Sequence, residues 1–203
     1  MKRLVVATAN SGKVREIAQL LADLPLEILS LSDFPAASPP EETGATFVEN
    51  AVAKAVHAAK VTGEMALADD SGIEVDALGG EPGVRSSRFG GPGMTDAGRN
   101  GLLLQKLRHI PDQKLTARFR CAAALAWPSG EVRTFEGVCE GRITRGPRGT
   151  HGFGYDPIFY LPQYGKTMAE LPPEEKNLIS HRGRAMSQVK AALRELLGGN
   201  APS

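Results

Sequence analysis

Hydrophobic and polar residues alternate along this chain with periods that predict both strands and helices. Short apolar runs at residues 4–8 and 26–31 are typical of buried strands. The apolar positions between them recur at helical spacing; they are Val14, Ile17, Leu21 and Leu24. The chain therefore opens with a strand, a helix and a second strand, and this pattern indicates an α/β fold.

Three further helices are expected. Thr46 and Glu49 match the capping box, which predicts a long helix from Thr46 to about Gly63. The other two are expected at 95–109 and 180–197. Glycines at 198 and 199 end the last helix, so we expect residues 198–203 to form a frayed tail.

A hairpin is expected in the second half of the chain. Residues 117–127 alternate apolar and polar side chains, Pro128-Ser129-Gly130 supplies a turn, and residues 131–144 return. Proline- and glycine-rich stretches at 32–45 and 79–93 predict irregular segments.

The composition limits the possible partners. With 203 residues the chain fits one large domain or two small lobes over residues 1–203. Its 24 basic and 23 acidic residues nearly cancel, so no net field favours nucleic acid or a membrane surface. No apolar run reaches about 18 residues, and the one after Lys2-Arg3 is too short for a signal peptide. We expect no nucleic-acid partner and no membrane partner.

Cysteines and histidines match no metal spacing. Cys121 and Cys139 lie far apart in predicted strands, and we expect buried, reduced thiols in a cytoplasmic protein rather than a disulfide. His151 and His181 lack the spacing of a zinc pair.

Two adjacent acids, Asp69 and Asp70, follow the apolar run Met65–Ala68. This pattern predicts a buried strand that ends at the acids and delivers them to the carboxyl edge of the sheet, where α/β folds bind ligands. Neighbouring carboxylates repel unless a cation or a shifted pKa relieves them, which favours a metal or base site. The alternative is a cap or turn at Ser71-Gly72.

Phosphate-binding candidates lie in two places. Thr8–Lys13 joins the first strand to the first helix, where backbone N–H groups, the helix dipole and Lys13 suit a phosphate. It is not a P-loop, because Ala7 and Val14 stand where glycine and Ser or Thr are needed, and an ordinary turn is the alternative. Asn50 and Lys54 share a helix face and could hold phosphate oxygens.

Other polar segments are ambiguous alone. Glu41 and Glu42 lie in an acidic loop that could simply be solvated. The glycines of 149–157 would let Phe153 lie against a flat ring, although a plain connecting turn is equally compatible. Basic residues at 180–184 oppose the dipole of the last helix unless they have partners, which favours a functional role.

Together these segments resemble the inosine/xanthosine triphosphate pyrophosphatase family. The resemblance runs from Lys2 to about Leu197 with every motif residue present. The matching motifs, in order, are Thr8–Lys13, Phe47–Ala51 with Lys54, Ala68–Gly72, Gly152–Pro157 and Ser180–Gly183.

The resemblance implies an α/β fold with a long mixed central β-sheet flanked by helices, and two lobes with the active-site cleft between them. It also implies a homodimer and Mg²⁺-dependent hydrolysis of ITP, dITP and XTP to the monophosphate and pyrophosphate. Such an enzyme keeps these nucleotides out of DNA and RNA.

Residue roles also follow from the resemblance. Asp70 would be the general base and a metal ligand, and Glu42 would help to hold Mg²⁺, with Glu41 or Asp69 as further helpers. The implied substrate-binding residues are Thr8, Ala9, Asn10, Ser11, Gly12, Lys13, Lys54, Ser71, Phe153, Gly154, Tyr155, Asp156, Lys176, His181 and Arg182. Of these, the lysines and Thr8–Lys13 would hold the triphosphate, and 153–156 with His181 and Arg182 would surround the base.

Two alternatives stay open from the residues alone. One is a non-catalytic nucleotide- or RNA-binding module, although unneutralised acids would repel its ligand and the chain lacks a basic face. The other is a phosphohydrolase that acts on modified pyrimidine nucleotides.

Overall fold

The computed structural model describes residues 2–8, 10–34 and 40–198. Its strands are β1 (Lys2–Val6), β2 (Leu26–Ser30), β3 (Met65–Val75), β4 (Thr116–Ala126), β5 (Val132–Ile143), β6 (Phe159–Leu161) and β7 (Lys166–Thr167). Its α-helices are α1 (Ser11–Leu21), α2 (Phe47–Thr62), α3 (Asp96–Lys106), α4 (Pro173–Ile179) and α5 (His181–Gly198). Short 3₁₀ helices occupy Leu31–Asp33, Asp76–Leu78, Gly83–Arg88, Asp112–Lys114, Asp156–Ile158 and Met168–Glu170.

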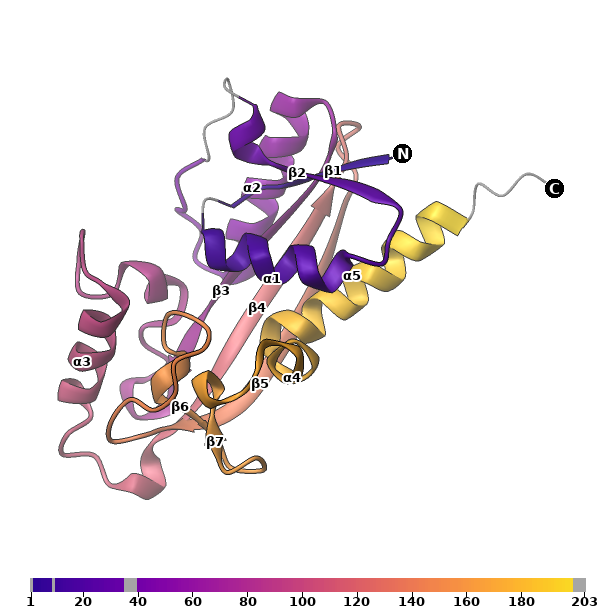
Figure 1. Cartoon of the computed structure of the whole chain (residues 1–203). Coiled ribbons are helices and arrows are strands. Elements are labelled where there is room, and N and C mark those ends of the chain that lie inside the picture. The colour runs from indigo at the N-terminus through magenta and orange to yellow at the C-terminus, as the bar shows by residue number, and fades with distance from the viewer. Residues whose placement is uncertain (1, 9, 35–39, 199–203) are drawn as a thin grey trace. The chain divides into compact units, whose positions relative to one another are not determined.

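The strands form one mixed sheet in the order β2-β1-β3-β4-β5-β6-β7 (Figure 1). β1 is parallel to both β2 and β3, whereas β6 is antiparallel to β5 and β7. β1 ends at Val6, opposite Leu67 of β3. The predicted mixed sheet with flanking helices is confirmed.

Contacts divide the chain into two compact units. Unit 1 comprises residues 1–70, 121–137 and 182–203, and unit 2 comprises 71–120 and 138–181. Each unit has its own hydrophobic core, since the two clusters of buried apolar residues fall one in each unit.

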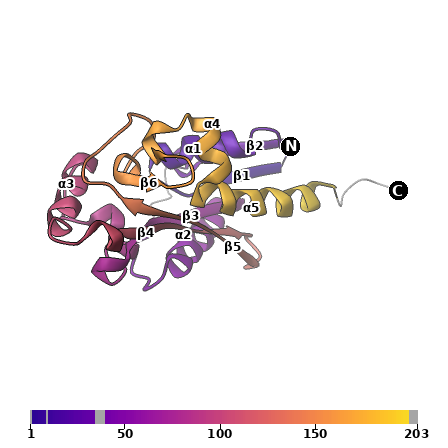
Figure 2. The ribbon, with the colours of Figure 1, turned by 90° about the horizontal axis from the view of Figure 1, so that it is seen from below.

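In unit 1, helices cover both faces of the strands. Alternate residues of a strand point to opposite faces, and Leu4 and Val6 pack with Ile17 of α1 and Met186 of α5. Figure 2 shows α2 on the other side of these strands from α1 and α5. The buried residues on α2 include a row of alanines, Ala51, Ala55, Ala58 and Ala59. Their small side chains let α2 lie close to the strands, which places its polar side chains near β3.

In unit 2, the core lies around Phe119, Phe159 and Leu103, with Leu103 contributed by α3. The rings of Phe119 and Phe159 lie 4.5 Å apart, centroid to centroid. α4 follows β7 and the 3₁₀ helix Met168–Glu170, and in the sequence only Ser180 separates it from α5.

Most of the predicted elements are present. Thr46 caps α2 by accepting from the Glu49 amide, while the Glu49 carboxylate accepts from Ala45 rather than from Thr46 as a strict capping box requires. Gly63 ends α2 with φ of 70°, and a turn after Trp127 joins β4 to β5. Cys121 and Cys139 are buried free thiols, as predicted. No helix within the described ranges has the length and apolar composition needed to cross a bilayer.

Other details differ from the sequence-based expectations. The segment 79–93, expected to be irregular, contains the 3₁₀ helix Gly83–Arg88. Helix α4 and strands β6 and β7 were not anticipated. Gly198 belongs to α5 rather than to a tail. The rest of that expected tail, 199–203, lies outside the described residues, as do Ala9 and 35–39 of the expected loop.

The largest difference concerns β3. The strand does not end at Asp69 and Asp70 but continues to Val75. Both carboxylates are therefore internal to a strand, two and three residues beyond the point where β1 ends. Their ionic partners in unit 1 make this buried position tolerable.

Candidate functional site

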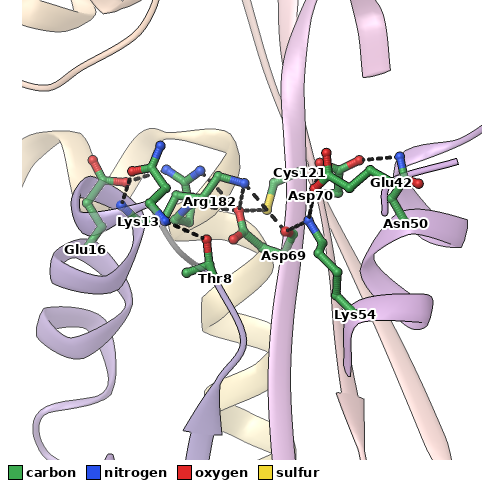
Figure 3. Close-up of polar contacts among 11 residues, drawn as sticks. Thr8, Lys13, Glu16, Glu42, Asn50, Lys54, Asp69, Asp70, Cys121 and Arg182 are labelled. Atoms are coloured by element: carbon green, nitrogen blue, oxygen red, sulfur yellow. Dashed lines mark hydrogen bonds and ion pairs between the residues drawn. The ribbon is translucent and has the colours of Figure 1, made fainter. Parts of the chain in front are cut away.

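Asp69 and Asp70 point to opposite faces of β3 (Figure 3). The pleat of a strand turns successive side chains to opposite sides. Asp69 meets Lys13 of α1 and Arg182 of α5, whereas Asp70 meets Asn50 and Lys54 of α2. The two acids therefore occupy different electrostatic environments within unit 1.

On the α2 side, Asp70 is bound by an amide and an ammonium. Asn50 Nδ2 donates to Asp70 Oδ2 at 2.9 Å, and Lys54 Nζ lies 3.6 Å from Asp70 Oδ1. Lys54 Nζ also donates to Glu42 Oε1 at 2.6 Å, so one ammonium joins the two carboxylates. Asn50 Oδ1 accepts from the Gly44 amide at 2.8 Å. The Asn50 side chain thus holds both Asp70 and the loop that carries Glu42.

Gly44 is required for this loop contact. A Cβ at Gly44 would lie 2.6 Å from Asn50 Oδ1 and 2.9 Å from Glu49 Cβ. Any larger residue would push the loop away from α2. The acidic segment next to the helix is therefore ordered by specific contacts, at least from Glu42 onward, rather than being a solvated turn.

The pKa values of this group follow from burial and neighbouring charge. Burial raises the pKa of Asp70 above its ordinary value, with Glu42 adding to the effect and Lys54 opposing it. Burial alone would lower the pKa of Lys54, but Asp70, Asp69 and Glu42 outweigh it and raise the pKa. The arrangement is a carboxylate that binds a proton more readily than usual beside a permanently charged ammonium.

On the other face, Asp69 lies in a fully buried ionic network. Its Oδ2 lies 3.1 Å from Lys13 Nζ and accepts from Arg182 Nη2 at 3.1 Å and Nε at 3.2 Å. Arg182 Nη1 donates to Glu16 Oε2 at 2.5 Å, and the Arg182 side chain is 2% exposed. Cys121 Sγ lies 3.9 Å from the same Asp69 oxygen. Burial and the Asp69 charge raise the pKa of the Cys121 thiol to about 12, so it stays protonated.

The cations of this network determine the charge of Asp69. Burial opposes its ionisation, but Lys13, Arg182 and Lys54 hold the pKa of Asp69 well below its ordinary value. Asp69 is therefore a permanent anion that holds two cations in place, whereas Asp70 is a group that can exchange a proton.

Two of the three predicted phosphate-binding lysines, Lys13 and Lys54, meet at one backbone atom. Lys54 Nζ lies 2.8 Å from the Asp69 carbonyl oxygen, and Lys13 Nζ approaches the same oxygen at 3.5 Å. They reach it from α2 and α1, on opposite faces of β3. Unit 1 thus brings two ammonium groups together beside the predicted base.

The start of α1 has the expected helix N-terminus. Asn10 Oδ1 accepts from the Lys13 amide at 3.1 Å, and Thr8 Oγ1 accepts from the Asn10 amide at 3.2 Å. Ser11 and Gly12 form the first turn, and Ser11 is exposed. The N–H groups of this turn can receive an anion. The predicted residue Ala9 lies outside the described residues.

In unit 2, three predicted residues contact one another. Asp156 Oδ2 accepts from the Phe153 amide at 2.9 Å and from Lys176 Nζ at 2.6 Å. Lys176 Nζ also lies 4.9 Å from the centre of the Phe153 ring, a cation–π distance. Gly152 has φ of 75°, and a Cβ there would lie 2.1 Å from Asp156 Oδ2. This tight turn therefore requires glycine, and it leaves Phe153 half-buried.

The remaining predicted residues of unit 2 are more dispersed. His181 is buried and stacks on Phe119, with ring centres 4.5 Å apart and planes 12° apart. Tyr155 is buried and donates to the Ser86 carbonyl at 2.8 Å. Ser71 is half-buried in β3.

The described residues contain no group of three or more histidine, cysteine or carboxylate side chains suited to hold a metal ion. The pair Glu42 and Asp70, already gathered around one cation in the form of Lys54, is a smaller set. Mg²⁺ commonly binds one or two carboxylates together with substrate phosphates and waters, so this donor set suits it.

An open cavity of about 740 Å³ in unit 2 contains none of the predicted site residues. It is lined by Asp112, Leu115, Arg142, Ile143, Thr144, Arg145, Gly146, Pro147, Arg148, Tyr160 and Pro162. Arg145 donates to the Leu107 and Ile110 carbonyls and to Asp112. Its guanidinium therefore has partners within the protein.

Several polar residues beside the predicted site residues were not predicted from the sequence. Glu16 follows Lys13 by three residues on α1, and this helical spacing could have identified it. Asp96 and Asn100, which contact Gly154 from α3, had no signal of this kind because 54 or more residues separate them from their partner.

The chain is similar to known proteins over nearly its whole length. The profile of the Ham1 family matches residues 4–192. The chain is 54% identical over 190 residues to a dITP/XTP pyrophosphatase of Geobacter sulfurreducens, covering 94% of this chain and 96% of the relative. It is 51% identical over 199 residues to a dITP/XTP pyrophosphatase of Geobacillus kaustophilus, covering 98% of each.

Solved structures of Ham1 proteins have the same fold as this chain. A HAM1 protein from Coxiella burnetii superposes with a TM-score of 0.88 at 48% identity, covering 96% of this chain and all of that one. The Ham1 protein of Staphylococcus aureus gives a TM-score of 0.86 at 39% identity with the same coverage.

Proposed function

Because this chain belongs to the Ham1 family, we propose that it is a nucleoside triphosphate pyrophosphatase acting on dITP, ITP and XTP. The reaction breaks the bond between the α- and β-phosphates and yields the monophosphate and pyrophosphate. Its role is to remove nucleotides with hypoxanthine or xanthine bases before they enter DNA or RNA. Within unit 1, one observation supports this chemistry best: Lys54 joins Glu42 and Asp70 beside Lys13.

Asp70 is the proposed general base. Burial raises its pKa, so it is a stronger proton acceptor than an exposed carboxylate. Asn50 fixes one of its oxygens by donating to Oδ2, and Oδ1 faces the Lys54 ammonium. In the reaction, Asp70 takes the proton of the attacking water, and the departing phosphate group carries away the electrons of the broken P–O bond.

Mg²⁺ is the proposed metal, with Glu42 and Asp70 as its protein ligands. When bound, it would neutralise phosphate charge and favour departure of pyrophosphate. The two carboxylates already share one cationic partner, which supports their ability to share another. Glu41 is exposed, and Asp69 points to the other face of β3, which makes both weaker candidates.

Lys13, Lys54 and the first turn of α1 are proposed to hold the triphosphate. The two ammonium groups meet at the Asp69 carbonyl, and the N–H groups of Ser11 and Gly12 add a dipole that favours anions. Lys176 is proposed to contact phosphate as well, and Ser71 to touch the substrate.

The base is proposed to stack on Phe153, with Gly154, Tyr155 and Asp156 as its neighbours in the loop. Glycines flank the half-buried ring, so a flat ligand can approach it. His181 and Arg182 are proposed to act near the base. Since Arg182 already binds Glu16 and Asp69, its contribution depends on that network.

The oligomeric state and the cellular compartment are proposed from the family resemblance and from the two thiols. The protein is a homodimer, which light scattering after gel filtration tests. It works in the cytoplasm, in keeping with the buried free thiols Cys121 and Cys139.

A panel of nucleoside triphosphates with Mg²⁺ and a pyrophosphate readout tests the function. We expect turnover of ITP, dITP and XTP far above that of ATP and GTP, and loss of activity in excess chelator. Orthophosphate as the first product would contradict the reaction. Binding without turnover would indicate a nucleotide-binding module, and preference for modified pyrimidine nucleotides would indicate another phosphohydrolase.

A further inference from the structure

The loop that carries Phe153 has little intrinsic rigidity. Gly149, Gly152 and Gly154 all adopt positive φ, at 83°, 75° and 63°. Glycine has more backbone freedom than any other residue, so this segment would sample many conformations if it lacked tertiary contacts. The position of the Phe153 ring therefore depends on the groups that bind the loop backbone.

Helix α3 binds both polar backbone groups of Gly154, the residue directly after Phe153. Asp96 Oδ2 accepts from the Gly154 amide at 2.8 Å, and Asn100 Nδ2 donates to the Gly154 carbonyl at 3.1 Å. Asp96 and Asn100 are four residues apart and share a helix face. All of these residues belong to unit 2.

The two side chains are themselves held in place. Arg99 Nη2 donates to Asp96 Oδ1 at 2.7 Å, so each carboxylate oxygen of Asp96 has one partner. Thr95 caps α3 by accepting from the Gly98 amide at 3.1 Å, which fixes the helix start. Phe153 is thus held from within its loop by Asp156, through its own amide, and from α3 through the next residue.

The buried side chain of Asn100 lowers the stability of the fold. It is 6% exposed, and its Oδ1 is buried without a hydrogen-bond partner among the described residues. A buried amide oxygen without a donor lowers stability. The hydrogen bond that Asn100 donates to the Gly154 carbonyl offers a reason for this residue at a buried position.

We propose that Asp96 and Asn100 are positioning residues for base recognition, which act by holding Gly154 so that the Phe153 ring is fixed for stacking. The ligand they serve is the planar purine of the triphosphate, and this inference rests on the proposed function of Phe153. Loss of either contact lets the loop move, so binding of the base weakens while the chemistry at Asp70 continues.

Steady-state kinetics with ITP test this inference through a double-mutant cycle. Asp96→Ala is expected to raise KM about tenfold, the effect of losing a hydrogen bond to a charged group, and to change kcat by less than about threefold. In a Phe153→Ala background the same substitution is expected to change KM by less than about twofold, because its effect runs through the ring. A full tenfold effect in that background would overturn the proposal.

Three companion variants separate positioning from folding. Asn100→Leu, of similar size, is expected to raise KM several-fold without lowering Tm, because it also removes the unpartnered oxygen. Asp96→Asn retains an acceptor for the Gly154 amide, so it is expected to restore KM to within about threefold of the wild type. Asp76→Ala is the matched control, because Asp76 lies in the same unit and its side chain accepts from Thr116 and Arg118. Its KM is expected to stay unchanged.

Hydrogen exchange supplies a readout without substrate. Faster amide exchange in residues 152–156 of Asp96→Ala, with the rest of unit 2 unchanged, supports the proposal, and unchanged exchange overturns it. A wild-type protein that turns over none of ITP, dITP and XTP contradicts the proposed function itself. An active wild type in which Asp96→Ala and Asn100→Leu both keep normal KM contradicts only the positioning role.

Discussion

Asp69 and Asp70 are neighbours in β3, yet the pKa of one is lowered and the pKa of the other is raised. The strand pleat sends Asp69 toward Lys13 and Arg182 and sends Asp70 toward α2 (Figure 3). Pairs of acids with divergent pKa values often divide the work of a site. Here Asp69 holds Lys13 and Arg182 in place, and Asp70 is the carboxyl with the raised pKa.

Substitution of the two acids should therefore give different results. Asp70→Asn is expected to lower kcat by about 10²-fold or more, since the proton acceptor and a metal ligand are lost, with Tm unchanged or slightly raised. Asp69→Asn is expected to destabilise the fold by about 3 kcal/mol, because it weakens a buried ion network. Kinetics and thermal denaturation of both variants check this. Near-normal turnover of Asp70→Asn would show that Asp70 is not the base.

The contributions of Asp69 and Asp70 to stability should change with pH in opposite directions. Both carboxyls have an ordinary pKa of 3.8. The lowered pKa of Asp69 gives stability that is present above pH 3.8 and is lost as the pH falls toward its folded pKa. The raised pKa of Asp70 gives stability that is present below pH 3.8 and is lost as the pH rises through its folded pKa.

The measurement is Tm between pH 3 and pH 7 in chelator, so that no metal contributes. The deficit of Asp69→Asn relative to the wild type is expected to grow as the pH rises, and Asp70→Asn is expected to gain on the wild type over the same range. Parallel curves for all three proteins would contradict the assignment.

Metal dependence should run through Glu42. Glu42→Gln removes one of the two proposed anionic ligands, so the Mg²⁺ concentration for half-maximal activity is expected to rise about tenfold or more. Glu41→Gln is the matched control, since Glu41 is the exposed neighbour in the same loop. If the Mg²⁺ concentration for half-maximal activity rises in Glu41→Gln and stays unchanged in Glu42→Gln, Glu41 rather than Glu42 is the metal ligand.

Base selection should depend on Arg182 but not on Phe153. Hypoxanthine and xanthine carry an acceptor at ring position 6 where adenine carries a donor, so a buried donor there discriminates strongly. Arg182→Lys keeps a charge for Asp69 and Glu16 but loses the guanidinium fork, and it is expected to narrow the ratio of kcat/KM for ITP over ATP. Phe153→Ala is expected to weaken both purines alike, since each offers a similar face.

Both ratios come from kcat/KM of ITP and ATP in the two variants. Arg182→Ala is less informative, because it would leave the buried Asp69 and Glu16 carboxylates without this partner and destabilise the fold by about 3–5 kcal/mol. An unchanged ITP-to-ATP ratio in Arg182→Lys would place base selection elsewhere.

Local patterns in the sequence determined most of the secondary structure and the family of this protein. Hydrophobic spacing predicted β1, α1 and the β4–β5 hairpin, and Thr46 and Gly63 marked the ends of α2. These signals are local, since helix spacing, caps and strand alternation depend on residues within a few positions of each other. The ordered set of motifs also identified the family, because each short motif kept its residues even though none was decisive alone.

Only the tertiary structure decided how the acids are used. The sequence predicted that the strand would stop at Asp69 and Asp70, because the apolar run ends there. Carboxylates inside a buried strand are costly without partners. β3 continues because cations reach it from distant parts of the chain: Arg182 lies 113 residues from Asp69, and Lys13 lies 56 residues away. The same holds for Asp96 and Gly154, 58 residues apart. Charge compensation between such distant residues exists only once the chain has folded, so no local pattern can encode it.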